Sequence, residues 1–261
     1  MKKALITGAS SGIGREIALL LAEQSVELII HGRDLAALAE LAQEIGSKTK
    51  VTICQAELAS YDGSQRVLQA LQEGFPDVVI NNAGFGLYGD FVNQGPQETQ
   101  KMIAANCAAV VSICQHMAYW WKQEQVAGTI MNVSSALSFI PTPGAAVYAA
   151  TKAFINSFSR SIDVELEPYG IRVLTACPGR VATNFAATAS KGNVDTREHG
   201  GMVLDPKAVA QAIVDQIEKR EPLRVINWKY RLLLFLRCFL PERFAMQKLY
   251  ESLKARAAPK E

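Results

Sequence analysis

Seven short apolar runs, separated by segments with apolar residues at helical spacing, constrain the fold of this chain more than any other feature. The runs are Ala4–Thr7, Val26–Ile30, Val51–Cys54, Val78–Ile80, Thr129–Val133, Ile171–Ala176 and Leu223–Ile226. Almost continuously apolar strands that alternate with helices are typical of a parallel sheet covered on both faces. The alternation therefore predicts an α/β fold with a single Rossmann-type doubly wound parallel sheet of about seven strands. The length of 261 residues suits one such domain and is too short for two.

Capping residues indicate where two of the intervening helices begin. Asp34 precedes a segment whose apolar residues recur at helical spacing up to Ile45. Asp205 and Pro206 form an N-cap followed by proline at the first helical position. Two longer patterns, residues 97–123 and 145–167, predict long helices that are partly apolar.

A glycine-rich turn, Thr7–Gly14, follows the first strand and opens a helix predicted from Arg15 to Gln24. Glycines permit a tight turn, and a helix N-terminus offers unpaired N–H groups to a pyrophosphate. The spacing G-x-x-x-G-x-G differs from the standard Rossmann G-x-G-x-x-G, but its position at the first strand–helix turn predicts a dinucleotide site. The residues expected to contact the dinucleotide are Gly8, Ser10, Ser11, Gly12, Ile13 and Gly14.

The end of the second strand distinguishes between two dinucleotides. NAD(H) favours an acidic residue beside its ribose 2′-hydroxyl, whereas the 2′-phosphate of NADP(H) favours an arginine. No carboxylate stands immediately at the strand end in Ile29–Arg33, and Arg33 follows the strand. We therefore predict NADP(H) rather than NAD(H) as the cofactor. In the alternative interpretation, Arg33 is a solvated loop charge and Asp34 only caps a helix.

Four further motifs lie at the ends of successive strands or follow them. They are Asn81–Gly84, Asn132–Ser135, Tyr148–Lys152 and Pro178–Thr183, and Tyr148 lies thirteen residues beyond Ser135. Together with the TGxxxGxG turn, these motifs resemble the classical short-chain dehydrogenase/reductase family. The resemblance extends from about Lys3 to Ile226. It implies an enzyme that transfers a hydride between a nicotinamide cofactor and a CH–OH or C=O group.

The resemblance also implies a role for each matched residue. Ser135, rather than Ser134, matches the catalytic serine, Tyr148 the general acid/base and Lys152 its partner. Asn106 matches the asparagine of the catalytic tetrad, where it would hold a water molecule that links Lys152 to solvent. The implied contacts on the adenosine side are Glu57, Leu58, Asn82, Ala83 and Gly84. Those beside the nicotinamide are Tyr148, Lys152, Pro178, Gly179, Val181 and Thr183. Glu57 replaces the aspartate that the family usually has near the adenine.

Independently of the resemblance, Tyr148 and Lys152 are chemically suited to proton transfer. Residues four apart share one face of a helix. A tyrosine titrates at about pH 10, so it needs help to exchange protons near neutrality. The Lys152 ammonium and an oxidised nicotinamide ring are expected to lower the pKa of Tyr148. Ser135 is expected to donate a hydrogen bond to the substrate oxygen.

Apolar residues in the loops beyond the strand ends indicate the substrate class. The candidates are Phe85, Leu87, Leu137, Phe139, Ile140, and Asn184 and Phe185 at the start of a lid-like segment that ends near Leu204. We therefore predict an NADP(H)-dependent reductase of a hydrophobic ketone or aldehyde. The alternatives are an alcohol or hydroxysteroid-type dehydrogenase, a 3-oxoacyl reductase and, from another class, a non-catalytic NADP(H)-sensing regulator.

The segment from Trp228 to Glu261 differs in charge from the rest of the chain. It carries eight Lys/Arg and three Asp/Glu, whereas residues 1–227 carry nineteen and twenty-two. We therefore divide the chain into a catalytic domain, residues 1–227, and a basic, hydrophobic helical extension, residues 228–261. The extension either packs over the substrate cleft or a subunit interface, or contacts a membrane surface through residues 228–254. A transmembrane anchor is disfavoured because Leu232–Leu240 is too short and contains Arg237.

Charge and cysteine content indicate the remaining partners and the compartment. The net charge of +2 does not indicate a nucleic-acid-binding protein. Five scattered cysteines without a CxxC pair disfavour a metal site or a disulfide framework. Together with an apolar N-terminal run that stops at Gly8, they predict a cytoplasmic protein. The family resemblance implies a homodimer or homotetramer formed through the two long helices.

Overall fold

A computed structural model of the chain describes residues 1–72, 74–190, 202–237, 241, 243, 246–248 and 250–251. Seven strands within these residues form one sheet of order β3-β2-β1-β4-β5-β6-β7, and every pairing is parallel. The strands are β1 (Lys3–Thr7), β2 (Glu27–Gly32), β3 (Val51–Gln55), β4 (Val78–Asn81), β5 (Gly128–Val133), β6 (Ile171–Cys177) and β7 (Leu223–Val225). The doubly wound parallel sheet predicted from the apolar runs is therefore confirmed.

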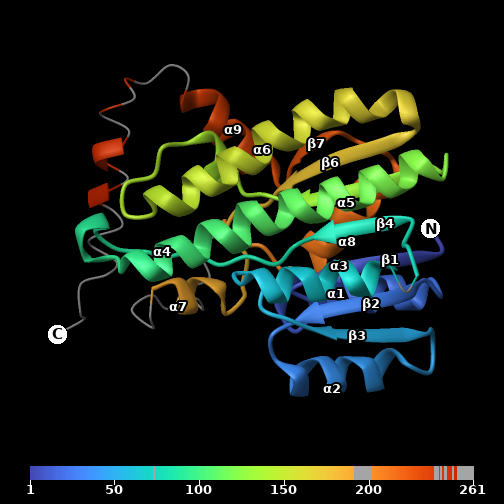
Figure 1. Ribbon diagram of the computed structural model, residues 1–261. Coiled ribbons are helices and arrows are strands. Elements are labelled where there is room, and N and C mark those ends of the chain that lie inside the picture. Colours follow the sequence, from blue (N-terminus) through green and yellow to red (C-terminus); the bar gives the residue numbers. More distant parts are fainter. Residues whose placement is uncertain are drawn as a thin grey trace.

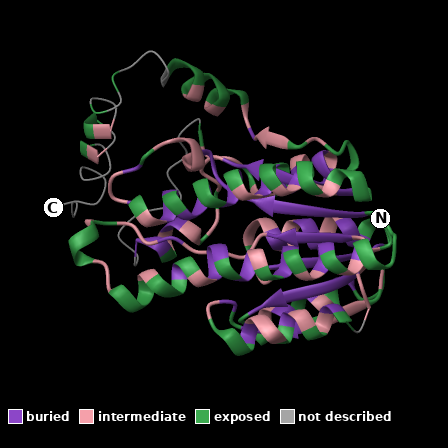
Figure 2. Cartoon of the chain, turned by 45° about the horizontal axis from the view of Figure 1, so that its top comes forward, coloured by how far each residue is buried: buried purple, intermediate pink, exposed green. Residues whose placement is uncertain are grey.

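Helices cover both faces of this sheet (Figure 1). One face packs against α1 (Gly12–Glu23), α2 (Leu35–Ile45) and α8 (Pro206–Glu218). The other face packs against α3 (Tyr61–Gln72), α5 (Ala109–Gln123) and α6 (Ala146–Leu166). Successive strand residues point to opposite faces, so the five inner strands β2, β1, β4, β5 and β6 are buried on both sides, as Figure 2 shows, whereas the edge strands β3 and β7 are only partly buried. This double burial explains why the strands are apolar almost without interruption.

The predicted N-caps are confirmed at both helices. The Asp34 side chain accepts a hydrogen bond from the backbone N–H of Ala37, over 3.1 Å. The Asp205 side chain accepts one from the N–H of Ala208, over 3.2 Å. Each carboxylate satisfies a backbone donor that the first turn of the helix leaves unpaired, so these two sequence signals placed α2 and α8 correctly.

Two helix predictions need correction. The helix that follows the glycine turn begins at Gly12 rather than Arg15. The helix predicted over 97–123 consists of α4 (Pro96–Ile103), a π-helical turn, η2 (Ala104–Ala108), and α5. The combined stretch Pro96–Gln123 is long and apolar enough to cross a membrane, but half of its most apolar window is buried inside the protein. Its hydropathy therefore reflects packing against the sheet.

The strand order reverses between β1 and β4, and this switch point creates a crevice at the carboxyl ends of the strands. Asn82, directly after β4, donates hydrogen bonds from Nδ2 to the carbonyl oxygens of Thr7 (3.0 Å) and Gly8 (3.2 Å). Thr7 Oγ1 in turn accepts from the N–H groups of Asn82 and Ala83, each over 3.0 Å. These contacts fix the glycine turn against β4, so the crevice has a rigid floor.

Candidate active site

A cavity of about 810 Å³ lies in this crevice at the carboxyl ends of the strands. All the residues predicted from the sequence to contact cofactor or substrate oxygen line it, except Gly14 and Asn106. The segments that meet here come from the ends of β1 through β6. The structure thus brings together residues that the sequence spreads from Gly8 to Thr183.

The glycine turn has the shape that close approach of a phosphate requires. Gly8 (φ +69°) and Gly12 (φ +56°) both adopt left-handed backbone conformations. A Cβ at Gly8 would lie 2.9 Å from the Cα of Ala83, and one at Gly14 would overlap the carbonyl oxygen of Gly8. Ser11 at the N-cap of α1 makes no side-chain cap hydrogen bond. The first turn of α1 thus fits a pyrophosphate, and Gly14 serves helix packing beneath it.

Tyr148 and Ser135 lie together inside the cavity. The Tyr148 side chain, near the start of α6, is 6% exposed, and Ser135 is the N-cap of the short helix η3 (Ala136–Phe139). Burial, with nearby Tyr88, raises the pKa of Tyr148, and a hydrogen bond with Ser135 only partly opposes this. Tyr148 is therefore a neutral phenol, the form that can donate a proton to a substrate oxygen.

Lys152 lies one helical turn beyond Tyr148 on α6, and its side chain is buried. Its Nζ donates a hydrogen bond to the carbonyl oxygen of Val133 over 2.9 Å and lies 5.9 Å from the centre of the Tyr148 ring. Burial lowers the pKa of Lys152 to about 8. Ser134 Oγ donates to the backbone carbonyl oxygen of Lys152 over 2.9 Å. Both serines border the cavity, but the Ser134 hydroxyl is bonded to the helix, whereas the Ser135 hydroxyl lies beside Tyr148.

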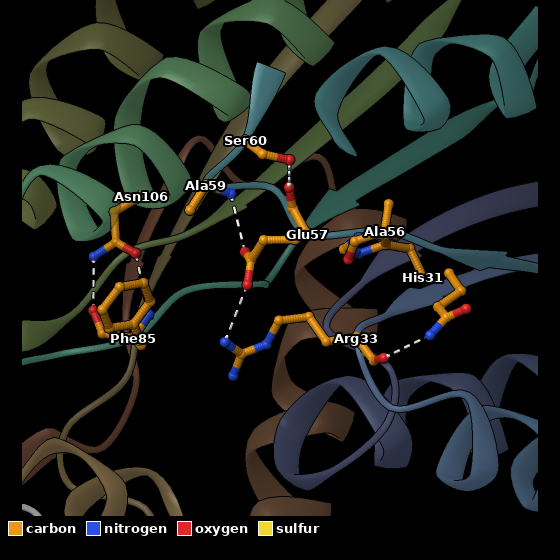
Figure 3. A network of polar contacts seen from close by, with 9 residues as sticks. His31, Arg33, Ala56, Glu57, Ala59, Ser60, Phe85 and Asn106 are labelled. Atoms are coloured by element: carbon orange, nitrogen blue, oxygen red, sulfur yellow. Dashed lines mark hydrogen bonds and ion pairs between the residues drawn. The ribbon is translucent and has the colours of Figure 1, made fainter. Parts of the chain in front are cut away.

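Asn106 occupies the π-helical turn η2 and is buried behind the cavity wall. Figure 3 shows its amide facing the backbone of Phe85: Oδ1 accepts from Phe85 N–H over 3.1 Å, and Nδ2 donates to Phe85 C=O over 2.9 Å. Nδ2 also donates to Thr151 Oγ1 over 3.1 Å. A Cβ at Gly84 would lie 2.9 Å from Asn106 Oδ1. Asn106 thus fixes the loop after β4 against α6.

Arg33 and Glu57 meet at the adenosine end of the cavity. Arg33 Nη1 lies 3.2 Å from Glu57 Oε2, and Glu57 Oε1 accepts from the N–H of Ala59 over 3.0 Å (Figure 3). Both side chains are largely exposed. The sequence indicated no carboxylate immediately at the end of β2, but the end of β3 supplies one beside Arg33. The ion pair forms because β2 and β3 are neighbours in register.

His31 ties the same two strand ends together from inside. Its side chain is 2% exposed, and its Nε2 lies 3.1 Å from the carbonyl oxygen of Ala56, while Nδ1 accepts from Gly8 N–H over 3.4 Å. This pairing requires the neutral ring with its proton on Nε2. Burial lowers the pKa of His31 to about 4. His31 therefore holds the glycine turn and does not face a ligand.

Aromatic and apolar residues line the substrate end of the cavity. Of the sequence candidates, Phe85, Leu137, Asn184 and Phe185 line it, whereas Leu87, Phe139 and Ile140 do not. The Phe185 ring, on α7 (Phe185–Ala189), lies 5.4 Å from the Tyr148 ring. Most of the predicted lid segment, residues 191–201, lies outside the described residues. Leu204 pairs with Val181 in a short parallel bridge.

The C-terminal extension contributes two residues to the cavity that the sequence did not assign to it. Tyr230, on α9 (Trp228–Arg237), accepts a hydrogen bond from Arg180 N–H over 2.9 Å and donates one to Met202 C=O over 3.0 Å. A Cβ at Gly179 would overlap its ring. Tyr250 also lines the cavity and its hydroxyl donates to Asp90. The interpretation that the extension packs beside the substrate cleft therefore holds for these two tyrosines.

Among the described residues, the cavity lining that the sequence analysis did not select includes the larger polar side chains Tyr88, Asp90 and Arg180. Each lies in a loop after a strand, the part of an α/β fold that lines ligand sites. No residue pattern separated them from their loop neighbours. Within the described part of the chain, no group of three or more His, Cys, Asp or Glu residues is placed to hold a metal ion.

Comparison with known proteins identifies the class that this fold and site define. The family described as short chain dehydrogenase matches residues 2–193, and the chain belongs to this family of oxidoreductases. A relative from Mycobacterium tuberculosis, "Probable oxidoreductase EphD", is 31% identical over 245 residues, which cover 85% of this chain. Those residues cover only 40% of the mycobacterial protein, so this chain corresponds to one part of it.

Two solved structures of similar proteins extend over nearly the whole chain. A short-chain dehydrogenase from Sphingobium yanoikuyae, in complex with NADPH, is 28% identical with a TM-score of 0.82, and the match covers 91% of this chain and 94% of that one. A bulky-bulky ketone specific alcohol dehydrogenase from Comamonas testosteroni is 28% identical with a TM-score of 0.78. This match covers 91% of this chain and 92% of that one. The dehydrogenase fold and a site for a nicotinamide cofactor are thus shared features of the family.

Proposed function

We propose that this protein is an NADP(H)-dependent reductase of a hydrophobic ketone or aldehyde, with Tyr148 as the general acid. One observation carries the proposal: a buried, neutral tyrosine, a serine and a buried lysine meet in a cavity that begins at the glycine turn before α1. The far end of that cavity is largely aromatic and apolar. A neutral phenol suits reduction, because reduction of a carbonyl consumes a proton.

The residues of the chain divide the work of this reaction. When bound, the nicotinamide cofactor supplies the hydride. Ser135 donates a hydrogen bond to the carbonyl oxygen, which gains negative charge as the hydride arrives. The Tyr148 hydroxyl transfers its proton to that oxygen, and the O–H bond of the product alcohol forms. The Lys152 ammonium stabilises the phenolate left behind until solvent reprotonates it.

Asn106 acts in this scheme by positioning other residues. Its two hydrogen bonds with Phe85 hold the loop that follows β4, and its bond with Thr151 anchors that loop to α6. Thr151 is the neighbour of Lys152, so Asn106 links both walls of the site. The water molecule that would link Lys152 to solvent beside Asn106 is likewise proposed.

The preference for NADP(H) rests on Arg33 at the adenosine end. A guanidinium at the end of β2 suits a ribose 2′-phosphate. Glu57 accepts from this guanidinium and adds a negative charge nearby, so a 2′-phosphate must compete with Glu57 for Arg33. The NADPH named with the Sphingobium relative supports the same cofactor here. The ketone named with the Comamonas relative supports a bulky carbonyl substrate.

The alternative enzyme functions compatible with the site differ from the proposed one in their substrate or in the direction of the reaction. An alcohol or hydroxysteroid-type dehydrogenase and a 3-oxoacyl reductase use the same four side-chain roles. A non-catalytic NADP(H)-sensing regulator would bind cofactor without turnover. A panel that follows NADPH oxidation with bulky ketones, steroids, acyl thioesters and short ketones separates these functions. We expect the fastest turnover with bulky ketones, and turnover with none of these substrates would favour the regulator.

The Tyr148→Phe variant tests the general acid. We expect kcat to fall on the order of a thousandfold while the dissociation constant for NADPH stays within about twofold, because only the proton donor is lost. Stopped-flow kinetics and NADPH fluorescence titration measure the two quantities. Retained turnover would refute the role given to Tyr148.

The Arg33→Ala variant tests the cofactor preference. We expect the KM for NADPH to rise by about tenfold or more and that for NADH to change little, because only NADPH carries the 2′-phosphate. Arg66→Ala, at an exposed position on α3, is the control with the same change in charge. Equal effects of Arg33→Ala on the two cofactors would overturn the choice of NADP(H).

Assembly and compartment complete the proposal. We infer a homodimer or homotetramer in the cytoplasm, formed through α4, α5 and α6. Tyr119, Phe154 and Val164 on these helices are exposed although they are large and apolar. Sedimentation equilibrium of the purified chain distinguishes the monomer, dimer and tetramer.

A further inference from the structure

A second phenol, Tyr88, lies beside the general acid in the cavity. Its ring is edge-on to the Tyr148 ring, with the ring centroids 6.3 Å apart and the planes at 78°. The Phe185 ring is the other aromatic neighbour of Tyr148, at 5.4 Å between centroids. A Cβ at Gly86 would lie 3.2 Å from Phe185 and 3.3 Å from Tyr148, so the rings leave little room there. Of the two aromatic neighbours of Tyr148, only Tyr88 carries a polar group.

Backbone hydrogen bonds fix the position of Tyr88. Its N–H donates to the carbonyl oxygen of Ala189 at the end of α7 over 2.9 Å. The N–H of Gly89 donates to the carbonyl oxygen of Gly144 over 2.8 Å, and Gly144 lies just before α6, the helix that carries Tyr148. The loop after β4 is thus bonded to two other walls of the substrate end. Tyr88 therefore keeps its place relative to Tyr148.

The hydroxyl of Tyr88 is available to a ligand. Within the residues that the structure describes, no group forms a hydrogen bond with this hydroxyl, although the side chain is half-buried and lines the cavity. Burial raises the pKa of Tyr88, and the nearby charge of Arg180 only partly opposes this, so the phenol is neutral and can donate. Enclosed tyrosine hydroxyls usually have a hydrogen-bond partner. A ligand in the cavity can supply it.

In the proposed reaction, the reacting carbonyl oxygen is not that partner. A carbonyl oxygen accepts hydrogen bonds through two lone pairs, and Tyr148 and Ser135 use both when they donate to it. The substrate must therefore offer Tyr88 a second acceptor. Because the rings of Tyr88 and Tyr148 are neighbours, this acceptor belongs to a substituent next to the carbonyl. Phe185 offers an apolar surface to the other substituent.

We propose that Tyr88 is a specificity-determining residue that selects ketones with an oxygen atom on the carbon next to the carbonyl. Tyr88 donates a hydrogen bond to that oxygen, and the apolar substituent of the ketone contacts Phe185. This inference rests on the proposed function, in which Tyr148 remains the proton donor. Tyr88 itself transfers no proton. It thereby narrows the substrate class from bulky ketones to α-oxygenated ones.

Two ketones of nearly the same size and shape test this selection. In α-methoxyacetophenone an ether oxygen takes the place of one methylene group of butyrophenone, and each molecule has a single carbonyl. We expect Tyr88→Phe to lower the ratio of kcat/KM for α-methoxyacetophenone to that for butyrophenone by about five- to tenfold, the effect of one neutral hydrogen bond. The intrinsic reactivities of the two ketones cancel, because the ratio is compared between two proteins.

Binding without turnover separates this proposal from the proposed function. With NADP⁺ in place of NADPH, no hydride is available to reduce a ketone, and calorimetric titration measures the dissociation constant of each one. We expect Tyr88→Phe to raise the dissociation constant of α-methoxyacetophenone, relative to that of butyrophenone, by about five- to tenfold as well. Turnover of neither ketone with NADPH would contradict the proposed reductase, and the titration would then decide the role of Tyr88.

Tyr61→Phe is the matched control, because it removes the hydroxyl of an exposed tyrosine on α3. This control should leave both ratios as they are in the unchanged chain. The thermal unfolding midpoint of each variant shows whether the fold is intact. The proposal is overturned if Tyr88→Phe shifts neither ratio or if Tyr61→Phe shifts them equally. It is also overturned if the unchanged chain with NADP⁺ does not bind α-methoxyacetophenone.

Discussion

The two ends of the cavity are built in different ways. At the adenosine end, backbone fits against backbone: Gly8 packs on Ala83, Gly14 packs on Gly8, and strands in register fix both. At the substrate end, the walls are loops and the extension, and hydroxyl groups of Tyr230 and Tyr250 connect them. Backbone fits tolerate little change, whereas side-chain hydrogen bonds can be replaced as substrates diverge. The cofactor end of the cavity is therefore fixed, whereas the walls of its substrate end can change.

The largest expected effect is at the backbone fit, with the Gly14→Ala variant. Its methyl group would overlap the carbonyl oxygen of Gly8, and both groups are fixed by strand and helix. We expect a loss of more than about 3 kcal/mol in the free energy of unfolding and no measurable NADPH binding. Urea denaturation and fluorescence titration measure these quantities.

Gly95→Ala is the matched control for that substitution. Only the Glu98 side chain lies near the added methyl group, at 3.8 Å, and the backbone φ is −65°. We expect a change below about 1 kcal/mol. If Gly14→Ala were as mild as this control, the adenosine end would not be fixed by backbone fit.

His31 should make the adenosine end sensitive to acid. Its pKa is about 4 in the folded protein and about 6.5 when unfolded, so the unfolded chain binds the proton more tightly. The stability that neutral His31 provides is complete above pH 6.5 and is lost as pH falls to 4. We expect a loss of about 3 kcal/mol across this window.

The His31→Gln variant checks this expectation through urea denaturation at several pH values. Glutamine does not titrate, so the free energy of unfolding should depend less on pH between 6.5 and 4. His116, whose pKa burial also lowers, remains in both proteins and cancels from the comparison. If the free energy of unfolding depends on pH equally in both proteins, protonation of His31 does not destabilise the fold.

At the substrate end, the Tyr230→Phe variant tests the first hydroxyl contact. It leaves the N–H of Arg180 without this acceptor, which costs about 2 kcal/mol in local stability. We expect NADPH to bind roughly tenfold more weakly, because the loop Pro178–Thr183 loosens. Binding of adenosine 2′,5′-bisphosphate, which reaches only the adenosine end, should not change.

Calorimetric titration of both ligands measures this difference, and Tyr61→Phe is the control at an exposed tyrosine. Equal weakening of both ligands by Tyr230→Phe would show that the two ends of the cavity are coupled. The adenosine end would then not be fixed independently of the substrate end.

The sequence could predict the features that have a local signal and not those that depend on contacts between distant residues. Strands were found within one or two residues, because an apolar run is a local signal and β-strands buried on both faces require it. The glycine turn and the Tyr148–Lys152 pair were found because each motif is contiguous. The pairing of Arg33 with Glu57, and of Tyr250 with Asp90 at a separation of 160 residues, has no local signal. The π-helical turn that points Asn106 inward is equally invisible, since its residues are ordinary helix formers.

The smallest expected effect is at Tyr250, whose hydroxyl connects the end of the described extension to Asp90 across the mouth of the cavity. Tyr250→Phe removes this hydrogen bond and leaves the ring in place. We expect the KM for a bulky ketone to change by about two- to fivefold, corresponding to about 1 kcal/mol or less, while kcat and the dissociation constant for NADPH stay constant. Steady-state kinetics with a bulky and a short ketone provide the measurement. Because a short ketone does not reach the mouth, its KM should not move. A change in kcat for both ketones would place Tyr250 in the fixed part of the site and shift the boundary between the two ends.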